Sequence, residues 1–214
     1  IISSVDSSLG QIAQNHWAFL EHIRLDATPE QQHYFFDLVL KGHRLGNAFS
    51  EKGSKTVADL STTINLKADH AVVNGQKFFT TGALLAHLIP AVGLDTEGRP
   101  HVAILPQHSG GLTIINDWTG FGQRTTASGT VLLNQVKVDL NHVIPLYKAF
   151  ERPTVAGAIS QFIQAAIDAG IAIGAIEETI QYVRQYSRPW IDSGLEKATD
   201  DPYTIANIGD LKIK

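Results

Sequence analysis

The hydrophobic pattern of the chain changes its period twice, and this limits the folds that the chain can adopt. Apolar residues recur at helical spacing over residues 6–25, and short alternating or continuous apolar runs fill residues 61–138. Helical spacing then returns over residues 155–187. Separate runs of helices and strands are typical of an α+β fold. The sequence therefore predicts N-terminal helices, a middle β domain and a long helix that begins a C-terminal helical bundle.

The N-terminal part is expected to hold two helices. The first carries His16 on its apolar face. The second begins at Thr28-Pro29, where Thr28 is the N-cap, Pro29 lies in the first turn and Gln31 can complete a capping box. We expect this helix to end near Gly42, because glycine commonly follows the last helical turn.

The middle part has the turn signals of a module built from short strands. Asn74-Gly75 predicts a hairpin within residues 71–79, because a type I′ turn requires positive φ at both central residues. Such a density of strands favours an antiparallel sandwich or barrel. The other strands are expected over residues 61–67, 88–94, 102–105, 112–115 and 131–138. We expect three domains, over residues 1–43, 44–146 and 147–214.

The long helix predicted over residues 155–187 is apolar on most sides in its first half. Ser160, Gln161, Gln164 and Asp168 form a polar stripe at a spacing of three to four residues, which argues against a membrane span. A helix with so much apolar surface needs cover from further helices or from another subunit. Where further helices do not supply this cover, a homo-oligomer, a dimer or a tetramer, is expected to do so.

Composition argues against several functions. The net charge is −4 and no basic block occurs, so nucleic-acid and membrane-surface binding have no support. The absence of cysteine rules out disulfides and thiolate metal sites and fits a cytoplasmic protein. The nine histidines are scattered and predict no metal site. Without an initiator methionine, a signal peptide or a final helix cap, the chain is expected to be a fragment.

The stretch from Gly120 to Thr130 is the segment best suited to meet a polar ligand. It combines three glycines, four hydroxyl side chains and Arg124. Such a loop is poorly suited to a core, because its backbone is permissive and its side chains seek hydrogen bonds. We expect it to approach a polar ligand, most simply a phosphorylated one.

Four segments resemble the acyl-CoA dehydrogenase superfamily, whose order of helices, β domain and helical bundle is also the one predicted. Residues 47–53 resemble the Thr-Glu-Pro segment beside the flavin pyrimidine ring, with Lys52 in place of the usual proline. Residues 75–82 resemble the strand whose hydroxyl residue contacts the flavin N5 edge. The motifs at residues 117–124 and 187–194 resemble the sulfur-acquisition branch, which is similar to dibenzothiophene monooxygenase.

The resemblance implies a flavin-dependent monooxygenase. Such an enzyme takes reduced FMN from a separate flavin reductase and uses O2 to oxygenate a small organosulfur compound. The resemblance places Phe79 against the flavin ring and Ser50 and Thr81 at its edges. The two hydroxyls are then expected to open onto one shared hollow.

The resemblance also implies roles for charged residues and a histidine. Arg188, in an Arg-Pro-Trp motif with Trp190, would hold the FMN phosphate, and its guanidinium fork suits phosphate oxygens. It could reach the flavin of a neighbouring subunit. Arg124 is a second candidate for an anion. His16 would support the reacting oxygen by donating a proton or a hydrogen bond.

Two other functions remain open at this point. One is an FAD-dependent acyl-CoA dehydrogenase, although Ser160 and Gln161 stand where some of these enzymes carry the catalytic glutamate. The other is a non-catalytic flavin-fold protein that serves in binding or assembly. Each site residue also has a structural interpretation. Ser50 and Thr81 can be ordinary hydroxyls, and Arg188 can simply end a helix.

Overall fold

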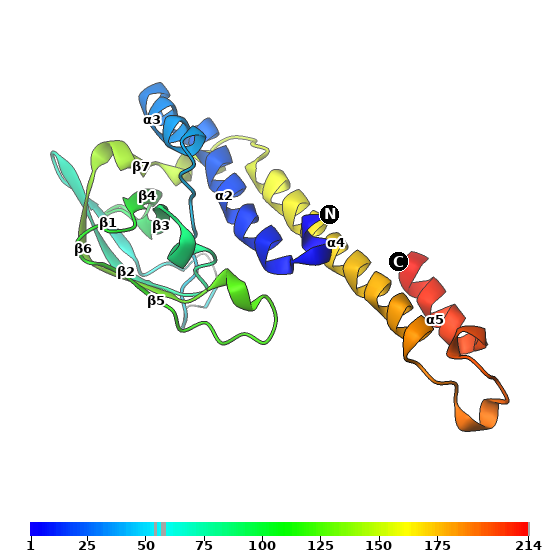
Figure 1. Cartoon of the computed structure of the whole chain (residues 1–214). Coiled ribbons are helices and arrows are strands. Elements are labelled where there is room, and N and C mark those ends of the chain that lie inside the picture. Colours follow the sequence, from blue (N-terminus) through cyan, green and yellow to red (C-terminus); the bar gives the residue numbers. More distant parts are fainter. Residues whose placement is uncertain (54, 57–58, 214) are drawn as a thin grey trace. The chain divides into compact units, whose positions relative to one another are not determined.

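The computed structural model describes residues 1–53, 55, 56 and 59–213, and it divides into two compact units (Figure 1). The larger unit is Ser8–Gln164, and the smaller one combines Ile1–Ser7 with the chain from Ala165 onward. Helices, then strands, then helices follow one another, which confirms the predicted α+β fold. The three domain ranges expected from the sequence stay a prediction.

Two helices precede the sheet, α2 (Ser7–Asp26) and α3 (Pro29–Leu40). The capping box of α3 is confirmed. The Gln31 N–H donates to the Thr28 hydroxyl at 3.3 Å, and the Thr28 N–H donates to the Gln31 side chain at 2.9 Å. Gly42 follows the helix with φ +92°, a conformation that glycine adopts without strain.

The β module is one curled seven-stranded sheet, a half-barrel (Figure 1). Its strands are β1 (Thr63–Leu66), β2 (His70–Lys77), β3 (Leu88–Leu94), β4 (Pro100–Pro106), β5 (Leu112–Ile115), β6 (Thr130–Asp139) and β7 (Val143–Ile144). Across the sheet they lie in the order β5-β6-β2-β1-β3-β4-β7, and β1 and β3 are the one parallel pair of neighbours among them. One apolar cluster forms around Ile89 and Val136. A second cluster joins Ile104 to Phe19 of α2 and Phe35 of α3, so these helices cover the sheet.

The hairpin predicted at Asn74-Gly75 is wrong. β2 runs through both residues, and its register with β6 shifts between Val73 and Gly75. The Gln135 N–H donates to Asn74 Oδ1 at 2.8 Å where the register shifts. A Cβ on Gly75 would lie 2.3 Å from Thr62 Oγ1, so glycine is required there. The dipeptide marks a β-bulge, which favours the same residue types as a tight turn.

A buried ion pair joins the segment before β1 to the end of β2. Lys77 Nζ lies 2.6 Å from Glu51 Oε1 and donates to the Phe49 carbonyl at 3.0 Å. The Glu51 carboxylate also accepts the N–H groups of Ser61 and Thr62, at 2.7 and 3.0 Å. Burial by itself would raise the pKa of Glu51. The hydrogen bonds from Lys77 and the other donors outweigh burial and lower this pKa to about 2.

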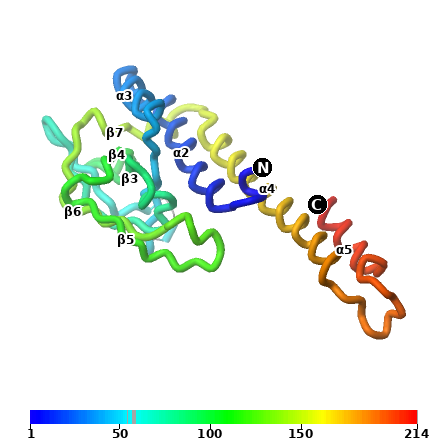
Figure 2. The backbone as a smooth tube through the Cα atoms, viewed as in Figure 1, coloured from blue at the N-terminus to red at the C-terminus, as the bar shows by residue number. Residues whose placement is uncertain are grey.

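The smaller unit contains helical segments that pack on one another. α4 (Ala156–Gln185) continues into it from the larger unit, and α5 (Pro202–Ile213) lies beside the second half of α4 (Figure 2). The short α1 (Ile2–Val5) crosses α4 at Gly174, where a Cβ would lie 2.3 Å from the Ser4 carbonyl oxygen. The bounds of α4 confirm the long helix predicted over residues 155–187.

α4 has the length and apolar composition of a membrane span, the one such helix in the described chain, and 17% of its most apolar window is buried. Its first turns nevertheless make polar contacts with α2. Gln11 Nε2 donates to Gln164 Oε1 at 3.3 Å, and Gln14 Nε2 donates to the Ser160 carbonyl at 3.5 Å. These contacts fit the predicted polar stripe and a helix that packs against protein.

We predict that Gly75→Ala lowers the free energy of unfolding by about 1–3 kcal/mol, because the new methyl group overlaps Thr62. Chemical denaturation of the purified protein measures this loss. Gly122→Ala is the matched control, since nothing lies within 4 Å of a Cβ there. Equal stability of the two variants would contradict the close approach of Gly75 to Thr62.

A second prediction concerns acid stability. The folded-state pKa of Glu51 is about 2 and its ordinary value is 4.5, so the unfolded chain takes up the proton first as the pH falls. The stabilisation by the Glu51 carboxylate is thus complete above about pH 4.5 and is lost toward pH 2. Urea unfolding of wild type and of Glu51→Gln/Lys77→Met between pH 7 and pH 2 should show their difference in stability changing over this window.

Lys77→Met alone should cost about 3–5 kcal/mol, because it leaves a buried carboxylate without its partner. Glu97→Gln is the control, since it removes an exposed carboxylate that pairs with Arg99 and is worth about 0–1 kcal/mol. A pH-independent difference between wild type and the double variant would refute the role assigned to Glu51.

Candidate functional site

The segment after α3 forms one edge of the candidate site. It pairs with the chain beyond β2, where the Phe78 N–H donates to the Ser50 carbonyl oxygen at 2.9 Å. The Ser50 side chain is half-buried, and its hydroxyl makes no hydrogen bond within the described chain. It opens onto a hollow of about 230 Å³, which we call the Ser50 hollow. Asn15 and Phe19 of α2 and Asn47 also line it.

A second hollow, of about 130 Å³, is lined by Phe79, and we call it the Phe79 hollow. Phe79 is half-exposed at φ +54°, which bulky side chains rarely adopt. Its ring meets Trp118 edge to face at a centroid distance of 6.4 Å, and Lys52 Nζ lies 5.2 Å from its centroid. Phe79 therefore presents an aromatic surface framed by a second ring and a cation.

A chain of hydroxyl groups links Thr81 to the glycine-rich loop. Thr81 Oγ1 lies 2.9 Å from Ser128 Oγ, which lies 2.8 Å from Thr126 Oγ1. Thr126 in turn donates to the Gln123 carbonyl at 2.9 Å, and Trp118 Nε1 donates to the same oxygen at 3.1 Å. Since Trp118 and Ser128 both line the Phe79 hollow, these bonds fix part of its rim.

The loop between β5 and β6, green in Figure 2, is fastened at its base by Asp117. The Asp117 carboxylate accepts the Thr130 hydroxyl at 2.7 Å and the Thr130 N–H at 2.8 Å. The hydroxyl bond is the main reason why the pKa of Asp117 lies below its ordinary value. A Cβ on Gly129 would lie 2.0 Å from the Ile115 carbonyl oxygen, so glycine is needed where the loop rejoins the sheet.

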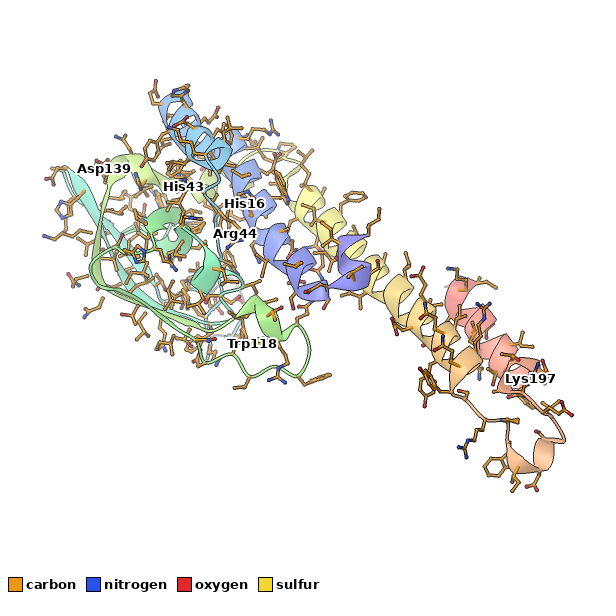
Figure 3. The ribbon with its side chains drawn as sticks, viewed as in Figure 1. His16, His43, Arg44, Trp118, Asp139 and Lys197 are labelled. Carbon is orange, nitrogen blue, oxygen red and sulfur yellow. The ribbon has the colours of Figure 1, made fainter. Side chains whose placement is uncertain are left out.

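His16 faces the β module from α2 (Figure 3). The Leu45 N–H donates to His16 Nδ1 at 3.2 Å. Burial is the main cause that lowers the pKa of His16, and the charge of Arg44 lowers it further. One turn earlier, Ile12 contacts Gly82, where a Cβ would lie 3.3 Å from Ile12 Cγ2. α2 thus brings His16 close to the segment that carries Thr81.

The shared hollow expected for Ser50 and Thr81 is not observed, and this expectation is wrong for the two hollows described. Ser50 lines the first, whereas Thr81 lines neither and reaches the second through Ser128. Ser50 lies with Asn15 and Phe19 of α2 in the first hollow, whereas Lys52 lines the second, because the chain bends at Lys52 and Gly53. Ser50 and Phe79 remain neighbours through the backbone bond to Phe78.

The arginine candidates are exposed. Arg124 lies in a short 3₁₀ turn of the glycine-rich loop, in the larger unit. Arg188 and Trp190 follow α4 in the smaller unit, and Arg188 makes no hydrogen bond or ion pair within the described chain. Exposed guanidinium groups are free to bind an anion, but the anion-binding roles of Arg124 and Arg188 stay predictions.

Sequence reasoning missed Glu51 and Lys77. A lysine in an alternating strand is normally assigned to the solvent face, yet Lys77 is fully buried. The signal that could have found the pair is the glutamate of the Thr-Glu-Pro-like segment, which needs a buried cation once the segment packs on the sheet. In the part of the chain that the structure describes, no three metal-ligating side chains lie close enough to hold an ion.

Comparisons with known proteins identify relatives that are similar to this chain. No protein-family model matches the chain. Dibenzothiophene monooxygenase from Rhodococcus qingshengii is 32% identical over 99% of the chain, which corresponds to 54% of that protein. FMN-bound TdsC from Paenibacillus sp. A11-2 is 31% identical with a TM-score of 0.89, over 99% of this chain and 57% of that one.

Methanesulfinate monooxygenase MsuC from Pseudomonas fluorescens is 28% identical with a TM-score of 0.84, over 99% of this chain and 54% of that one. The chain thus spans about half the length of the relatives that it matches. The predicted resemblance is confirmed over the whole chain. The chain has the acyl-CoA dehydrogenase-like fold and is similar over its whole length to the dibenzothiophene monooxygenase branch of flavin-dependent monooxygenases.

Proposed function

We propose that this chain is part of a monooxygenase that uses reduced FMN and O2 to oxygenate a small organosulfur compound. The observation that carries the proposal is the half-exposed Phe79 ring beside Trp118 and the hydroxyl chain of Thr81, in a fold that matches FMN-bound TdsC over 99% of this chain. The names of MsuC and dibenzothiophene monooxygenase support a sulfur compound as the substrate class.

The residues present fit a flavin ring. An isoalloxazine needs an aromatic or apolar surface against its plane and hydrogen-bond donors at its edge. Phe79 offers the surface, and Ser50, which lines the neighbouring hollow, offers a hydroxyl without a hydrogen-bond partner in the described chain. Thr81, held by Ser128, offers a second hydroxyl at a fixed position. Reduced FMN, when bound, supplies the electrons for the reaction with O2.

His16 is the residue proposed to serve the reacting oxygen. It is half-buried, and with Nδ1 occupied by the Leu45 N–H its remaining ring nitrogen is available to an oxygen atom. A hydrogen bond from an imidazole in a partly desolvated site is stronger than in water. His16 would thereby restrain the loss of H2O2 and favour oxygen transfer to the substrate.

The phosphate is assigned to Arg188, with Trp190 next to it, and Arg124 is the second candidate. A guanidinium binds phosphate oxygens in bidentate fashion. We place Arg188 at the flavin of a neighbouring subunit in a homo-oligomer, a dimer or a tetramer. The proposal further includes a separate flavin reductase and a cytoplasmic location.

The decisive test is turnover of the intact protein with reduced FMN, 18O2 and a panel of sulfones, thioethers and acyl-CoAs. We expect one labelled oxygen in an organosulfur product and no reaction with acyl-CoA. Anaerobic reduction of bound FAD by an acyl-CoA alone would instead support the dehydrogenase. A protein that binds neither FMN nor FAD would support the non-catalytic assembly role.

We also predict that Arg188→Ala weakens FMN binding by about 1.5–3 kcal/mol, roughly a tenfold to 150-fold rise in Kd, because a charge-assisted pair with the phosphate is lost. Flavin fluorescence titration measures it. Arg24→Ala is the control, since Arg24 is an exposed arginine paired with Glu21 on α2. A loss on Arg124→Ala with none on Arg188→Ala would move the phosphate to the glycine-rich loop.

A further inference from the structure

Two histidines accept hydrogen bonds from consecutive backbone N–H groups. The Arg44 N–H donates to His87 Nδ1 and the Leu45 N–H donates to His16 Nδ1, both at 3.2 Å. His87 directly precedes β3, whereas His16 lies on α2. The two rings therefore reach residues 44–45 from separate elements of the larger unit.

This geometry fixes which ring nitrogen of His16 carries the proton. A neutral imidazole has one N–H donor and one acceptor nitrogen, and an imidazolium has two donors and no acceptor. Because Nδ1 of His16 accepts an N–H, its single proton must be on Nε2. A second proton on Nδ1 would point at the Leu45 N–H and break the bond.

The side chain of Arg44 is held at the segment that binds His16. Its guanidinium donates to the Leu85 carbonyl, and its Nε atom is buried without a hydrogen-bond partner in the described chain. Its backbone is fixed as well, since the His87 N–H donates to the Arg44 carbonyl at 2.9 Å. Figure 3 labels His16 and Arg44 where α2 passes the β module.

The groups that bear on the protonation of His16 come from both sides of this contact. Arg44 is the charged group of the described chain that acts on His16, and its charge and the larger effect of burial both lower the His16 pKa. His87, whose Nδ1 accepts the Arg44 N–H, and His43, whose ring centroid lies 4.9 Å from that of His87, are the other titratable groups at this segment. On α2 itself, the neighbour of the His16 ring is the Trp17 ring, at a centroid distance of 5.3 Å.

We propose that the Leu45 N–H holds His16 as the neutral imidazole with its proton on Nε2, so that His16 donates a hydrogen bond to the oxygen species and keeps its proton. Arg44 is then the positioning residue, because its bonds to Leu85 and His87 fix the segment that binds His16. The role in oxygen chemistry rests on the proposed function, whereas the protonation state rests on the contacts of residues 44 and 45. Arg44 thus selects between the two roles open to His16, hydrogen-bond donor and acid.

The test measures the titration of each histidine in the intact protein by deuterium exchange at the ring C2 position, read by mass spectrometry. We expect the midpoint of His16 to lie below that of free histidine. It should shift upward in Arg44→Met, which removes the charge, and shift less in Arg44→Lys, which retains it. Arg24→Gln, which removes a cation of α2 that pairs with Glu21, should leave the midpoint unchanged.

A second measurement gives the consequence for the reaction. The fraction of reduced FMN that is oxidised to yield H2O2 without product should rise as the pH falls through the His16 midpoint. In Arg44→Met this rise should begin at a higher pH. A positioning role predicts this displaced pH profile, whereas a merely structural role of Arg44 predicts a loss of activity at every pH.

A His16 midpoint equal to that of free histidine in the wild type would overturn the proposal, as would an unshifted midpoint in a folded Arg44→Met. If Arg44→Met does not fold, the wild-type midpoint and that of Arg44→Lys still decide. If the midpoints behave as expected and no organosulfur compound is oxygenated, the proposed function fails. The conclusion that residues 44 and 45 keep His16 neutral would still stand.

Discussion

The buried pair of Glu51 and Lys77 is the interaction on which the rest of the site depends. Removing two charges from water costs several kcal/mol each, and the cost is offset only where the remaining hydrogen bonds are satisfied. Here Lys77 also binds the Phe49 carbonyl, and Glu51 also binds the start of the chain that leads into β1. The pair therefore holds one backbone segment against two others and keeps Ser50 beside Phe78.

That constraint explains why the aromatic and hydroxyl groups keep their places on a surface that is open. Phe79, Gln123 and Ala127 are three of the four non-glycine residues with positive φ in the described chain, and they lie on two segments that bind each other. Such conformations cost about 1–3 kcal/mol each and persist where surrounding contacts over-determine them. The hydroxyl chain from Thr81 to Gln123 and the bond from Trp118 supply such contacts.

The sequence predicts elements well where local chemistry is unambiguous. The capping box of Thr28 and the strands over residues 88–94 and 112–115 are observed with the expected bounds, because caps and turn residues act within a few positions. The Asn74-Gly75 prediction failed because a β-bulge and a hairpin turn need the same backbone freedom. The contact that distinguishes the bulge from a hairpin turn comes from Gln135, which is distant in sequence and whose N–H donates to Asn74 Oδ1.

The site was predicted less completely than the fold for a related reason. The resemblance identified Ser50, Phe79 and Thr81, but which hollow each side chain lines depends on where the backbone bends after Ser50. Neither periodicity nor composition contains that information. Lys77 was missed because its burial depends on Glu51, which lies 26 positions earlier. Pairs of this kind become visible only when the sheet brings the two segments together.

Several large apolar side chains of α4 are exposed in the described chain. Phe162 is 75% exposed and Tyr182 is 60% exposed, although solvent normally faces polar residues on a helix of this length. Relatives of about twice the length share this fold, so we infer that this surface is covered by the remainder of the family fold or by another subunit. The half-exposed Phe79 ring by itself bounds a cofactor on one side alone. The β module therefore supplies one wall of the proposed flavin site, with its hydroxyls held by hydrogen bonds to one another.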